Sequence, residues 1–286
     1  MQYIAPHSLE DAVQLLLDRP DAKVLAGGTD LLVRMRSDMA DPETILDIKR
    51  IDAMRTITQE DGGWRIGAAV SGAEMGENAG LVADWPGVVE ATNLIGSTQI
   101  QGRATMAGNL CNASPAADSV PAMVAAGAIA RVAGPKGTRD VPVQDIPTAP
   151  GKTSLGKGEL VASIFLPAKA AGSSDAYLRF IPRTEMDIAV VGCGVSLTLD
   201  ASGICTAARV ALGAVAPTVL LVDEAAKALI GTSVDDAALA ALAAAASAAA
   251  KPISDKRGTV EFRVHVAGVL ARRAAEIAKK RAGGAS

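Results

Sequence analysis

The sequence predicts a mixed α/β protein, and three observations support this prediction. First, the 286-residue chain is 49% hydrophobic, so it can bury a sizeable core in one large domain or in a few smaller ones. Second, short strand-like runs alternate with segments whose apolar residues recur at helical spacing. Third, glycine, proline or charged residues interrupt the apolar runs well before the roughly 18 residues that a membrane span needs. A soluble protein without a membrane span is therefore expected.

Charge, cysteine spacing and the N-terminus exclude several other classes. The formal net charge is -3 and only 2% of the residues are aromatic, which argues against nucleic-acid binding. Cys111, Cys193 and Cys205 show neither a C-x-x-C spacing nor a nearby histidine, so no zinc or iron–sulfur site is expected on this chain alone. His7 and His265 lie far apart, and neither is expected to be a ligand or a general base. No basic segment followed by an apolar stretch opens the sequence, so the expected location is the cytoplasm.

The first fifty or so residues predict a small unit of alternating helices and strands. Ser8 is a helix N-cap ahead of an apolar stripe at helical spacing, and Pro20 ends that helix. Residues 23–25 predict a short strand, residues 30–36 a brief helix and residues 44–48 a second strand.

A second unit begins with a turn and a strand over residues 62–70. Ser71 and Glu74 have the spacing of a capping box, which predicts that a helix begins there. The unit then continues through an amphipathic segment at 88–95, a Gly/Ser/Asn-rich connection from Gly96 to Pro115, a helix near 120–126, a strand near 129–132, and a strand over 159–166 that Pro167 stops.

The small, polar segment 169–175 predicts a domain boundary. Strands are expected at 177–181 and 190–199, followed by a turn at 200–203 and a third strand. Three helices come next, of which the middle one, at about 235–250, is nearly all alanine and should be tightly packed. The last, at about 259–281, carries a basic stripe that is expected to be an exposed face: Arg272, Arg273, Lys279, Lys280 and Arg281.

Residues 26–30 read A-G-G-T-D, directly after the strand predicted at 23–25. A strand that ends in glycines and opens a short helix exposes successive backbone N–H groups, which is one way in which proteins bind phosphate oxygens. The pattern is neither G-x-G-x-x-G nor a Walker A motif. On this loop alone, a tight strand-to-helix turn that needs a positive φ is the commoner explanation.

A second stretch, residues 99–118, favours a ligand. It reads Q-I-Q-G-R-A-T-M-A-G-N-L-C-N-A-S-P-A-A-D, with almost no bulky side chains. A long connection in a compact domain is usually disordered or functional, and this composition is not that of a disordered segment. Small residues let a ligand lie against the backbone while hydroxyl and amide groups orient it. The two loops together predict an extended, anionic and partly flat ligand such as a dinucleotide.

These two loop motifs, with R-T-E-M-D-I-A at 183–189, resemble the FAD-binding medium subunit of the molybdenum hydroxylases, the family that includes xanthine dehydrogenase and aerobic carbon monoxide dehydrogenase. The resemblance implies an α+β fold. A FAD-binding domain of the vanillyl-alcohol-oxidase (PCMH) type, 1–172, would consist of two α/β subdomains at about 1–58 and 59–172. A C-terminal medium-subunit domain, 173–286, would add a small antiparallel sheet and helices.

The resemblance also implies which residues hold FAD. The backbone of residues 26–31 and the second loop would bind the diphosphate, and Asp118 would hydrogen-bond toward the ribityl or ribose hydroxyls. Arg179 stands where relatives have lysine, and Ile188, where some have an aromatic residue, would face the isoalloxazine. Ala107 replaces a glycine of many relatives, so its φ is expected to be negative. The implied set is Leu25, Ala26, Gly27, Gly28, Thr29, Asp30, Leu31, Ala69, Ile95, Gly96, Thr105, Ala107, Gly108, Asn109, Ala117, Asp118, Leu160, Arg179 and Ile188.

Two residues of this set, Asp118 and Arg179, and the nearby Cys111 could also have a purely structural role. Asp118 could simply open a helix, since it follows S-P-A-A. Arg179 could belong to a solvated charge cluster with Arg183, Glu185 and Asp187. Cys111 is small and apolar enough to be ordinary packing.

An isoalloxazine needs position and hydrogen bonds rather than an acid–base residue, which agrees with the lack of a triad, paired acids or a nucleophile in the sequence. No catalytic residue and no metal ligand is therefore expected. The resemblance implies a large molybdopterin subunit, a small subunit with two two-iron two-sulfur clusters, an external electron acceptor, and a dimer of heterotrimers. Carbon monoxide is less favoured as the substrate of the large subunit, because the first loop has T-D where H-S is associated with that enzyme.

Two alternatives stay open. A stand-alone flavin reductase of the same domain type would need its own substrate pocket and a proton donor, and no such residue is evident in the sequence. An interaction subunit that has lost its flavin would carry bulky or charged residues in the two loops, and neither loop does.

Overall fold

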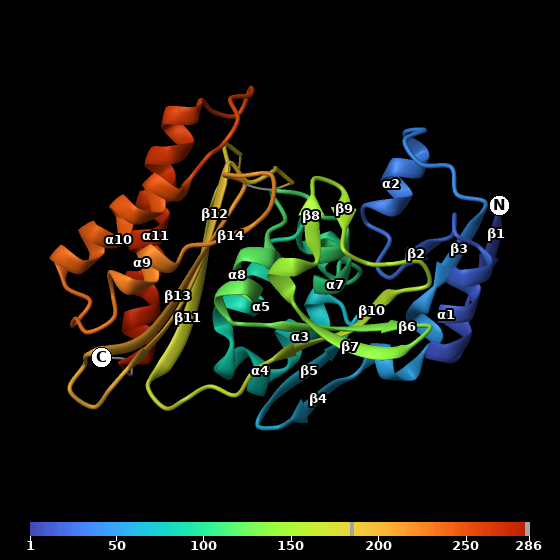
Figure 1. Cartoon of the computed structure of the whole chain (residues 1–286), viewed down its shortest axis with the longest axis horizontal. Coiled ribbons are helices and arrows are strands. Elements are labelled where there is room, and N and C mark those ends of the chain that lie inside the picture. The colour runs from blue at the N-terminus through green and yellow to red at the C-terminus, as the bar shows by residue number, and fades with distance from the viewer. Residues whose placement is uncertain (184–185, 284–286) are drawn as a thin grey trace.

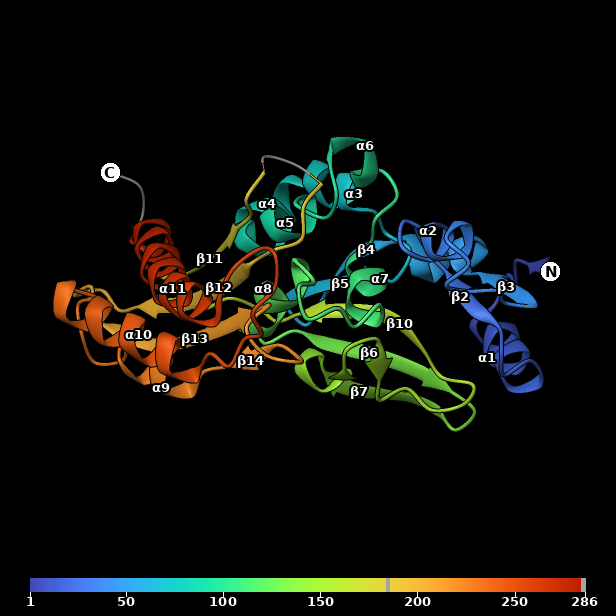
Figure 2. The ribbon, with the colours of Figure 1, turned by 90° about the horizontal axis from the view of Figure 1, so that it is seen from above.

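The computed structural model describes residues 1–183 and 186–283. Three main β-sheets follow one another along the longest axis of the molecule, and helices cover them (Figures 1 and 2). The first two sheets share one hydrophobic core, and the third sheet forms a second core with the C-terminal helices. Within the described residues, no helix is both long and apolar enough to cross a membrane.

The first sheet is parallel, with the strand order β1-β3-β2: β1 (Gln2–Ile4), β2 (Lys23–Leu25) and β3 (Thr44–Asp47). Helix α1 (Leu9–Asp18) begins as predicted at Ser8, whose hydroxyl accepts a hydrogen bond from the Asp11 amide at 3.1 Å. Helix α2 (Leu31–Arg36) follows the glycine pair and buries none of its side chains. Two 3-10 turns, η1 (Ile48–Arg50) and η2 (Asp52–Arg55), lead to the second sheet.

The second sheet is antiparallel, with the order β4-β5-β10-β6-β7: β4 (Ile57–Glu60), β5 (Gly63–Gly67), β6 (Ile129–Gly134), β7 (Gly137–Pro142) and β10 (Leu160–Leu166). The predicted capping box is confirmed, because Ser71 and Glu74 each accept the other's backbone N–H. The helices of this unit include α3 (Gly72–Glu77), α4 (Ala79–Asp84), α5 (Pro86–Asn93) and α8 (Ser119–Ala125). A 3-10 turn, η3 (Val143–Asp145), and a small hairpin, β8 (Pro147–Ala149) and β9 (Lys152–Thr153), complete it.

The prediction of one long irregular connection from Gly96 to Pro115 is wrong. Two short helices lie within it, α6 (Thr98–Gln101) and α7 (Met106–Cys111). Thr105 has extended backbone dihedrals and its hydroxyl accepts a hydrogen bond from the Gly108 amide at 2.9 Å, so it caps α7. Small, polar residues concealed these helices because no apolar stripe marks them.

The third sheet is antiparallel, with the order β11-β12-β13-β14: β11 (Ser173–Phe180), β12 (Val191–Leu199), β13 (Cys205–Gly213) and β14 (Leu220–Leu221). Helices α9 (Asp223–Lys227), α10 (Asp236–Ala249) and α11 (Val260–Ala282) cover one face, and α5 and α8 cover the other (Figure 1). The predicted packing of the alanine-rich segments is confirmed, since Ala246 of α10 and Ala271 of α11 are fully buried.

The expectation of an exposed basic face on α11 is wrong for three of its five residues. Arg281 reaches Glu90 of α5 and also donates to the Asp175 carbonyl at 3.0 Å, Lys279 donates to the Val234 carbonyl at 3.1 Å, and Arg272 pairs with Asp236 at 2.7 Å. Only Arg273 and Lys280 are exposed. These contacts join segments far apart in the sequence, so a local pattern could not reveal them.

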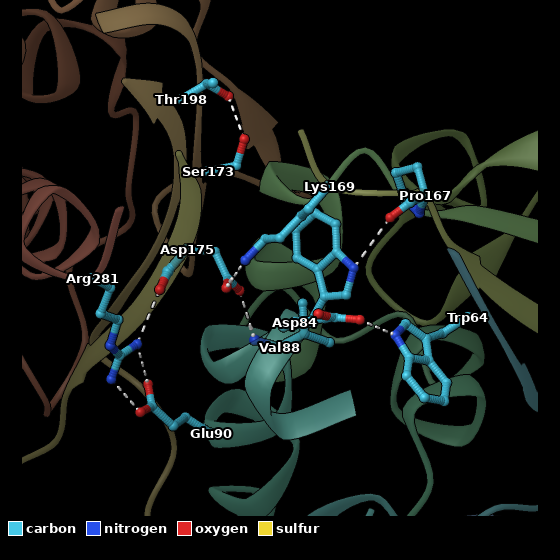
Figure 3. A network of polar contacts seen from close by, with 11 residues as sticks. Trp64, Asp84, Val88, Glu90, Pro167, Lys169, Ser173, Asp175, Thr198 and Arg281 are labelled. Atoms are coloured by element: carbon cyan, nitrogen blue, oxygen red, sulfur yellow. Dashed lines mark hydrogen bonds and ion pairs between the residues drawn. The ribbon is translucent and has the colours of Figure 1, made fainter. Parts of the chain in front are cut away.

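A buried polar network joins the second unit to the third sheet (Figure 3). Asp175 of β11 pairs with Lys169 at 3.0 Å and accepts a hydrogen bond from the Val88 amide at 3.0 Å, next to the start of α5. The Lys169 ammonium also lies over the Trp85 ring, 4.4 Å from its centroid. Burial lowers the pKa of Lys169 and raises that of Asp175, while each charge partly offsets the shift of the other.

Candidate functional site

A cavity of about 340 Å³ lies between the first and second units, and it is called here the loop cavity. Its walls include the residues after β2, the residues of α7, and residues of β10. Twelve of the residues that the sequence implied for the cofactor line it: Ala26, Gly27, Gly28, Thr29, Asp30, Leu31, Ile95, Thr105, Ala107, Gly108, Asn109 and Leu160. The structure therefore brings both glycine-bearing loops to one cavity.

The glycine pair is required by the protein's own packing. A Cβ atom on Gly27 would lie 1.8 Å from the Arg103 carbonyl oxygen, so the two loops meet backbone to backbone at this point. Gly28 has φ +77°, and a Cβ there would lie 2.7 Å from a methyl carbon of Leu25. The predicted strand-to-helix turn with a positive φ is thus observed at Gly28. At Gly27 a glycine is needed because the second loop approaches too closely for a side chain.

The first loop still offers free donors to the cavity. For Gly27 to Asp30, no backbone or side-chain acceptor for the amide N–H groups is found among residues 1–183 and 186–283. A run of backbone N–H groups without Cβ atoms in the way is suited to phosphate oxygens. This loop can therefore bind an anionic group with its main chain.

A small network on the other side of the first loop fixes its position. Lys49 donates to the Ala26 carbonyl at 2.8 Å and pairs with Asp47 at 2.7 Å, and the Tyr3 hydroxyl donates to the same carboxylate. Burial alone would raise the pKa of Asp47, but the hydrogen bonds from Lys49 and Tyr3 outweigh it and hold the pKa below its ordinary value. Asp47 is thus kept ionised, and it holds Lys49 against the loop.

The second loop is tied to the core through α7. The Asn109 side-chain oxygen accepts hydrogen bonds from the Ser119 amide at 3.1 Å and hydroxyl at 2.8 Å, which couples α7 to α8. Ala107 lies within α7 and is not among the residues with positive φ, so the expectation of a negative φ there is confirmed. The Thr105 cap and the Asn109 side chain therefore fix α7 beside the loop cavity.

Asp118 and Arg179 form a buried ion pair at 2.9 Å, with side chains only 11% and 7% exposed. Arg179 also donates to the Leu94 carbonyl at 2.8 Å, and the Tyr177 hydroxyl donates to Asp118 at 3.3 Å. Burial raises the pKa of Asp118 to about 6, although Arg179 and Tyr177 favour the charged form. The solvated-cluster explanation for Arg179 is therefore wrong.

Seven implied residues do not line the loop cavity. Ala69 lines a neighbouring cleft, and Ile188 is 51% exposed. Thr184 and Glu185 of the R-T-E-M-D motif lie outside the described residues. The residues away from the cavity are Leu25, Ala69, Gly96, Ala117, Asp118, Arg179 and Ile188, and their roles stay predictions.

Sequence reasoning missed further lining residues. Arg34 could have been found, because it lies one helical turn after Asp30. The hairpin residues Gly151 and Thr153 carry no motif. Cys111, expected to be ordinary packing, also lines the cavity, and burial raises the pKa of its thiol to about 12. The missed set is Lys23, Val24, Arg34, Ile48, Ala68, Ala104, Cys111, Asn112, Gly151, Thr153, Leu155, Glu159 and Val161.

Comparisons with known proteins give a consistent result across the chain. Residues 1–169 match the family described as the FAD binding domain in molybdopterin dehydrogenase, and residues 176–278 match the CO dehydrogenase flavoprotein C-terminal domain. The carbon monoxide dehydrogenase medium chain of Afipia carboxidovorans is 36% identical over 281 residues, which is 98% of this chain and 97% of that protein. The xanthine dehydrogenase FAD-binding subunit of Escherichia coli O157:H7 is 33% identical over 279 residues, covering 97% and 95% of the two chains.

Solved structures agree with these relatives. A chain of Cu,Mo-CO dehydrogenase in its cyanide-inactivated form superposes with a TM-score of 0.94 at 36% identity, and 98% of each chain is covered. A chain of quinoline 2-oxidoreductase from Pseudomonas putida 86 superposes with a TM-score of 0.89 at 27% identity, covering 99% of this chain and 98% of that one. The likeness thus extends over both glycine-bearing loops and the third sheet.

Proposed function

Because the chain belongs to the family of FAD-binding subunits of molybdenum hydroxylases, we propose that it holds FAD in the loop cavity and relays electrons to an external acceptor. The donor is the small iron–sulfur partner, and the chain is the flavoprotein subunit of an oxidoreductase complex. One observation carries the proposal: two loops from different sheets meet at Gly27 and Arg103 and enclose a cavity lined by free main-chain donors.

The residues present fit this cofactor. A volume of about 340 Å³ is within the usual range of small-molecule sites. The amides of Gly27 to Asp30 provide main-chain donors for a diphosphate, and Lys23 and Arg34 also line the cavity with positive charge. Asp118 does not line the loop cavity, and its hydrogen bond to a cofactor hydroxyl stays a prediction; Arg179 holds its carboxylate in place. When bound, FAD supplies all the redox chemistry.

The chain's own residues bind, orient and shield the cofactor. Lys49 and Asp47 hold the first loop from outside, and the Thr105 cap and Asn109 hold the second. Burial raises the pKa of the Cys111 and Cys193 thiols to about 12, so both are protonated at neutral pH. Among the described residues, no cluster of His, Cys, Asp or Glu could hold a metal ion.

The assembly follows from the family. Members work with a large molybdopterin-bearing partner and a small partner that carries the two-iron two-sulfur clusters. We extend the proposal to a dimer of heterotrimers in the cytoplasm and to an external acceptor such as NAD, a quinone or oxygen. The two separate hydrophobic cores support a division into domains 1–172 and 173–286. The two separate sheets of the first domain support its proposed subdomains, about 1–58 and 59–172.

The first experiment is to record the visible spectrum of the purified chain and to identify its co-purifying partners. We expect a flavin spectrum with one FAD per chain, released by heat as free FAD, and two partners that are removed only by strong salt or denaturant. A colourless chain that fails to bind added FAD would contradict the proposal. If the chain alone reduced a small substrate with a nicotinamide, the stand-alone reductase would replace the relay.

FAD affinity should depend on the ionisation of Asp118. Its pKa is raised to about 6, so the carboxylate is charged at pH 7.5 and becomes neutral as the pH falls through 6. Protonation removes the ion pair with Arg179, and FAD affinity is therefore expected to decrease between pH 7.5 and pH 5. The dissociation constant from flavin fluorescence quenching measures this, and Asp118→Asn should bind FAD weakly with no midpoint near pH 6. An identical pH profile in that variant would assign the dependence to another group.

A further inference from the structure

The strand before the first loop and the helix after it each bring a basic side chain to the loop cavity. Lys23 is the first residue of β2, and Arg34 lies in α2, one helical turn after Asp30, whose carbonyl accepts a hydrogen bond from the Arg34 amide at 3.0 Å. Both side chains line the cavity. Neither has a hydrogen-bond or ion-pair partner within the part of the chain that the structure describes. Along the chain, two unpartnered cations therefore flank the unpartnered amides that begin at Gly27.

The acidic side chains of the cavity wall do not neutralise these two cations. The acids that line the cavity are Asp30 and Glu159. Glu159 accepts two hydrogen bonds from Arg139 at 2.8 Å and one from the Gly156 amide at 2.7 Å, and these bonds hold its pKa at about 2. The charge of Glu159 is thus balanced by Arg139, which is not among the lining residues. Asp30 is then the one acid left to oppose two cations, so the wall carries an excess of positive charge.

The positive charge of Arg34 acts on the residue that ends the run of free amides. Desolvation in the cavity wall raises the pKa of Asp30, and the Arg34 charge partly offsets this shift. An anion bound by the amides would lie within reach of the same charge. A guanidinium group can bind a phosphate through two parallel N–H donors, and a lysine ammonium can bind one as a point charge. Both phosphates of a dinucleotide are anionic, and the cavity wall offers one cation for each.

We propose that Lys23 and Arg34 bind the diphosphate of FAD together with the amides of the first loop, and thereby favour a flavin that carries phosphate groups over a neutral one. This inference rests on the proposed function and adds two side chains to the main-chain donors already described. The amides fix the position of the diphosphate through hydrogen bonds. The two cations supply a part of the affinity that decreases as salt is raised. Both side chains act in binding alone and take no part in electron transfer.

The test is to titrate the deflavinated chain with FAD and with riboflavin, which has no phosphate, and to follow flavin fluorescence. We expect the dissociation constant of FAD to rise at least tenfold in Arg34→Gln and at least 100-fold in Lys23→Gln/Arg34→Gln, since each substitution removes a charge-assisted contact. Riboflavin affinity should change less than twofold. Between about 50 and 300 mM salt, FAD binding should weaken in the wild-type chain and much less in the double variant.

The matched control is Arg36→Gln/Lys280→Gln, which removes one arginine and one lysine that are exposed and do not line the cavity. Arg36 lies in α2 with Arg34, so the control keeps the helix and the net charge comparable. FAD affinity in the control should change less than twofold, and the melting temperatures of all the deflavinated chains should agree, because every substituted side chain is exposed.

Several outcomes would overturn the proposal. One is FAD binding by Lys23→Gln/Arg34→Gln that is as tight as in the control. Another is a loss of riboflavin affinity as large as the loss for FAD, which would place the cations at the flavin ring. In both cases the wild-type chain still binds FAD, so the proposed function stands. A wild-type chain that binds no FAD would instead contradict the proposed function, and this inference with it.

Discussion

Replacing Gly27 with alanine is expected to empty the loop cavity. The new Cβ would lie 1.8 Å from the Arg103 carbonyl oxygen, and that atom belongs to backbone and cannot rotate away. The two loops must separate by more than 1 Å, which disrupts the amide cradle as well as costing on the order of 1–3 kcal/mol in packing. We expect FAD affinity to fall at least 100-fold, about 2.7 kcal/mol, measured by titrating the deflavinated chain.

Gly102→Ala is the matched control for this substitution. Gly102 adjoins Arg103, has φ -69°, and would place its Cβ with no atom within 4 Å. It makes the same chemical change in the facing loop, next to Arg103, without strain or contact, so FAD affinity should change less than twofold. A Gly27→Ala chain that binds FAD as tightly as Gly102→Ala would show that the contact between the loops has no part in forming the site.

The sequence predicted those helix starts and turns that depend on residues only a few positions apart. Ser8 and the pair Ser71 and Glu74 mark helix starts because the capping groups lie within three residues of the amides they bind. The glycine pair is marked for a similar reason, since Gly28 needs its own positive φ. Gly27 is different, because its partner Arg103 lies 76 positions away and only the second loop's composition suggested a connection.

Other parts of the fold depend on contacts between residues far apart in the sequence, and no short sequence pattern indicated them. The three-residue strand β1 exists because it pairs with β3. Arg281 was expected to be solvated, yet it reaches Glu90, which is 191 positions away. Arg179 was expected either at the cofactor or in a solvated cluster, and only the fold shows it buried with Asp118 and Leu94. Long-range ion pairs of this kind cannot be read from periodicity or from capping patterns.

The third sheet supports the cofactor side of the second unit through α5. Asp175 accepts from the Val88 amide near the N-terminus of this helix, and Arg179 donates to the Leu94 carbonyl at its C-terminal end. A negative charge at the first turn and a positive charge at the last both complement the helix dipole. Ile95, which lines the loop cavity, directly follows the residue that Arg179 holds. β11 therefore fixes both ends of the helix that leads into the site.

Asp175→Asn is expected to cause a large loss of stability. The Asp175 and Lys169 side chains are 3% and 12% exposed, so the variant leaves the Lys169 ammonium in a desolvated place without its counter-charge. Removing one partner of a buried ion pair typically costs about 3–5 kcal/mol. We expect the free energy of unfolding, measured by urea denaturation at pH 7.5, to fall by that amount. The asparagine oxygen can still accept from the Val88 amide, so the loss should come mainly from the unpaired charge.

Two further variants test whether the unpaired charge is the cause. Asp175→Asn/Lys169→Met removes both charges and keeps the apolar stem over Trp85, so it should be more stable than Asp175→Asn alone. Glu224→Gln breaks an ion pair of similar length at the surface: Lys227 and Glu224 are 2.7 Å apart, against 3.0 Å for Lys169 and Asp175. Because the Lys227 and Glu224 side chains are 67% and 74% exposed, the free energy of unfolding should change by about 0.5 kcal/mol or less. If Asp175→Asn were as mild as Glu224→Gln, or if the double variant were the least stable of the three, the junction would owe its stability to packing rather than to this ion pair.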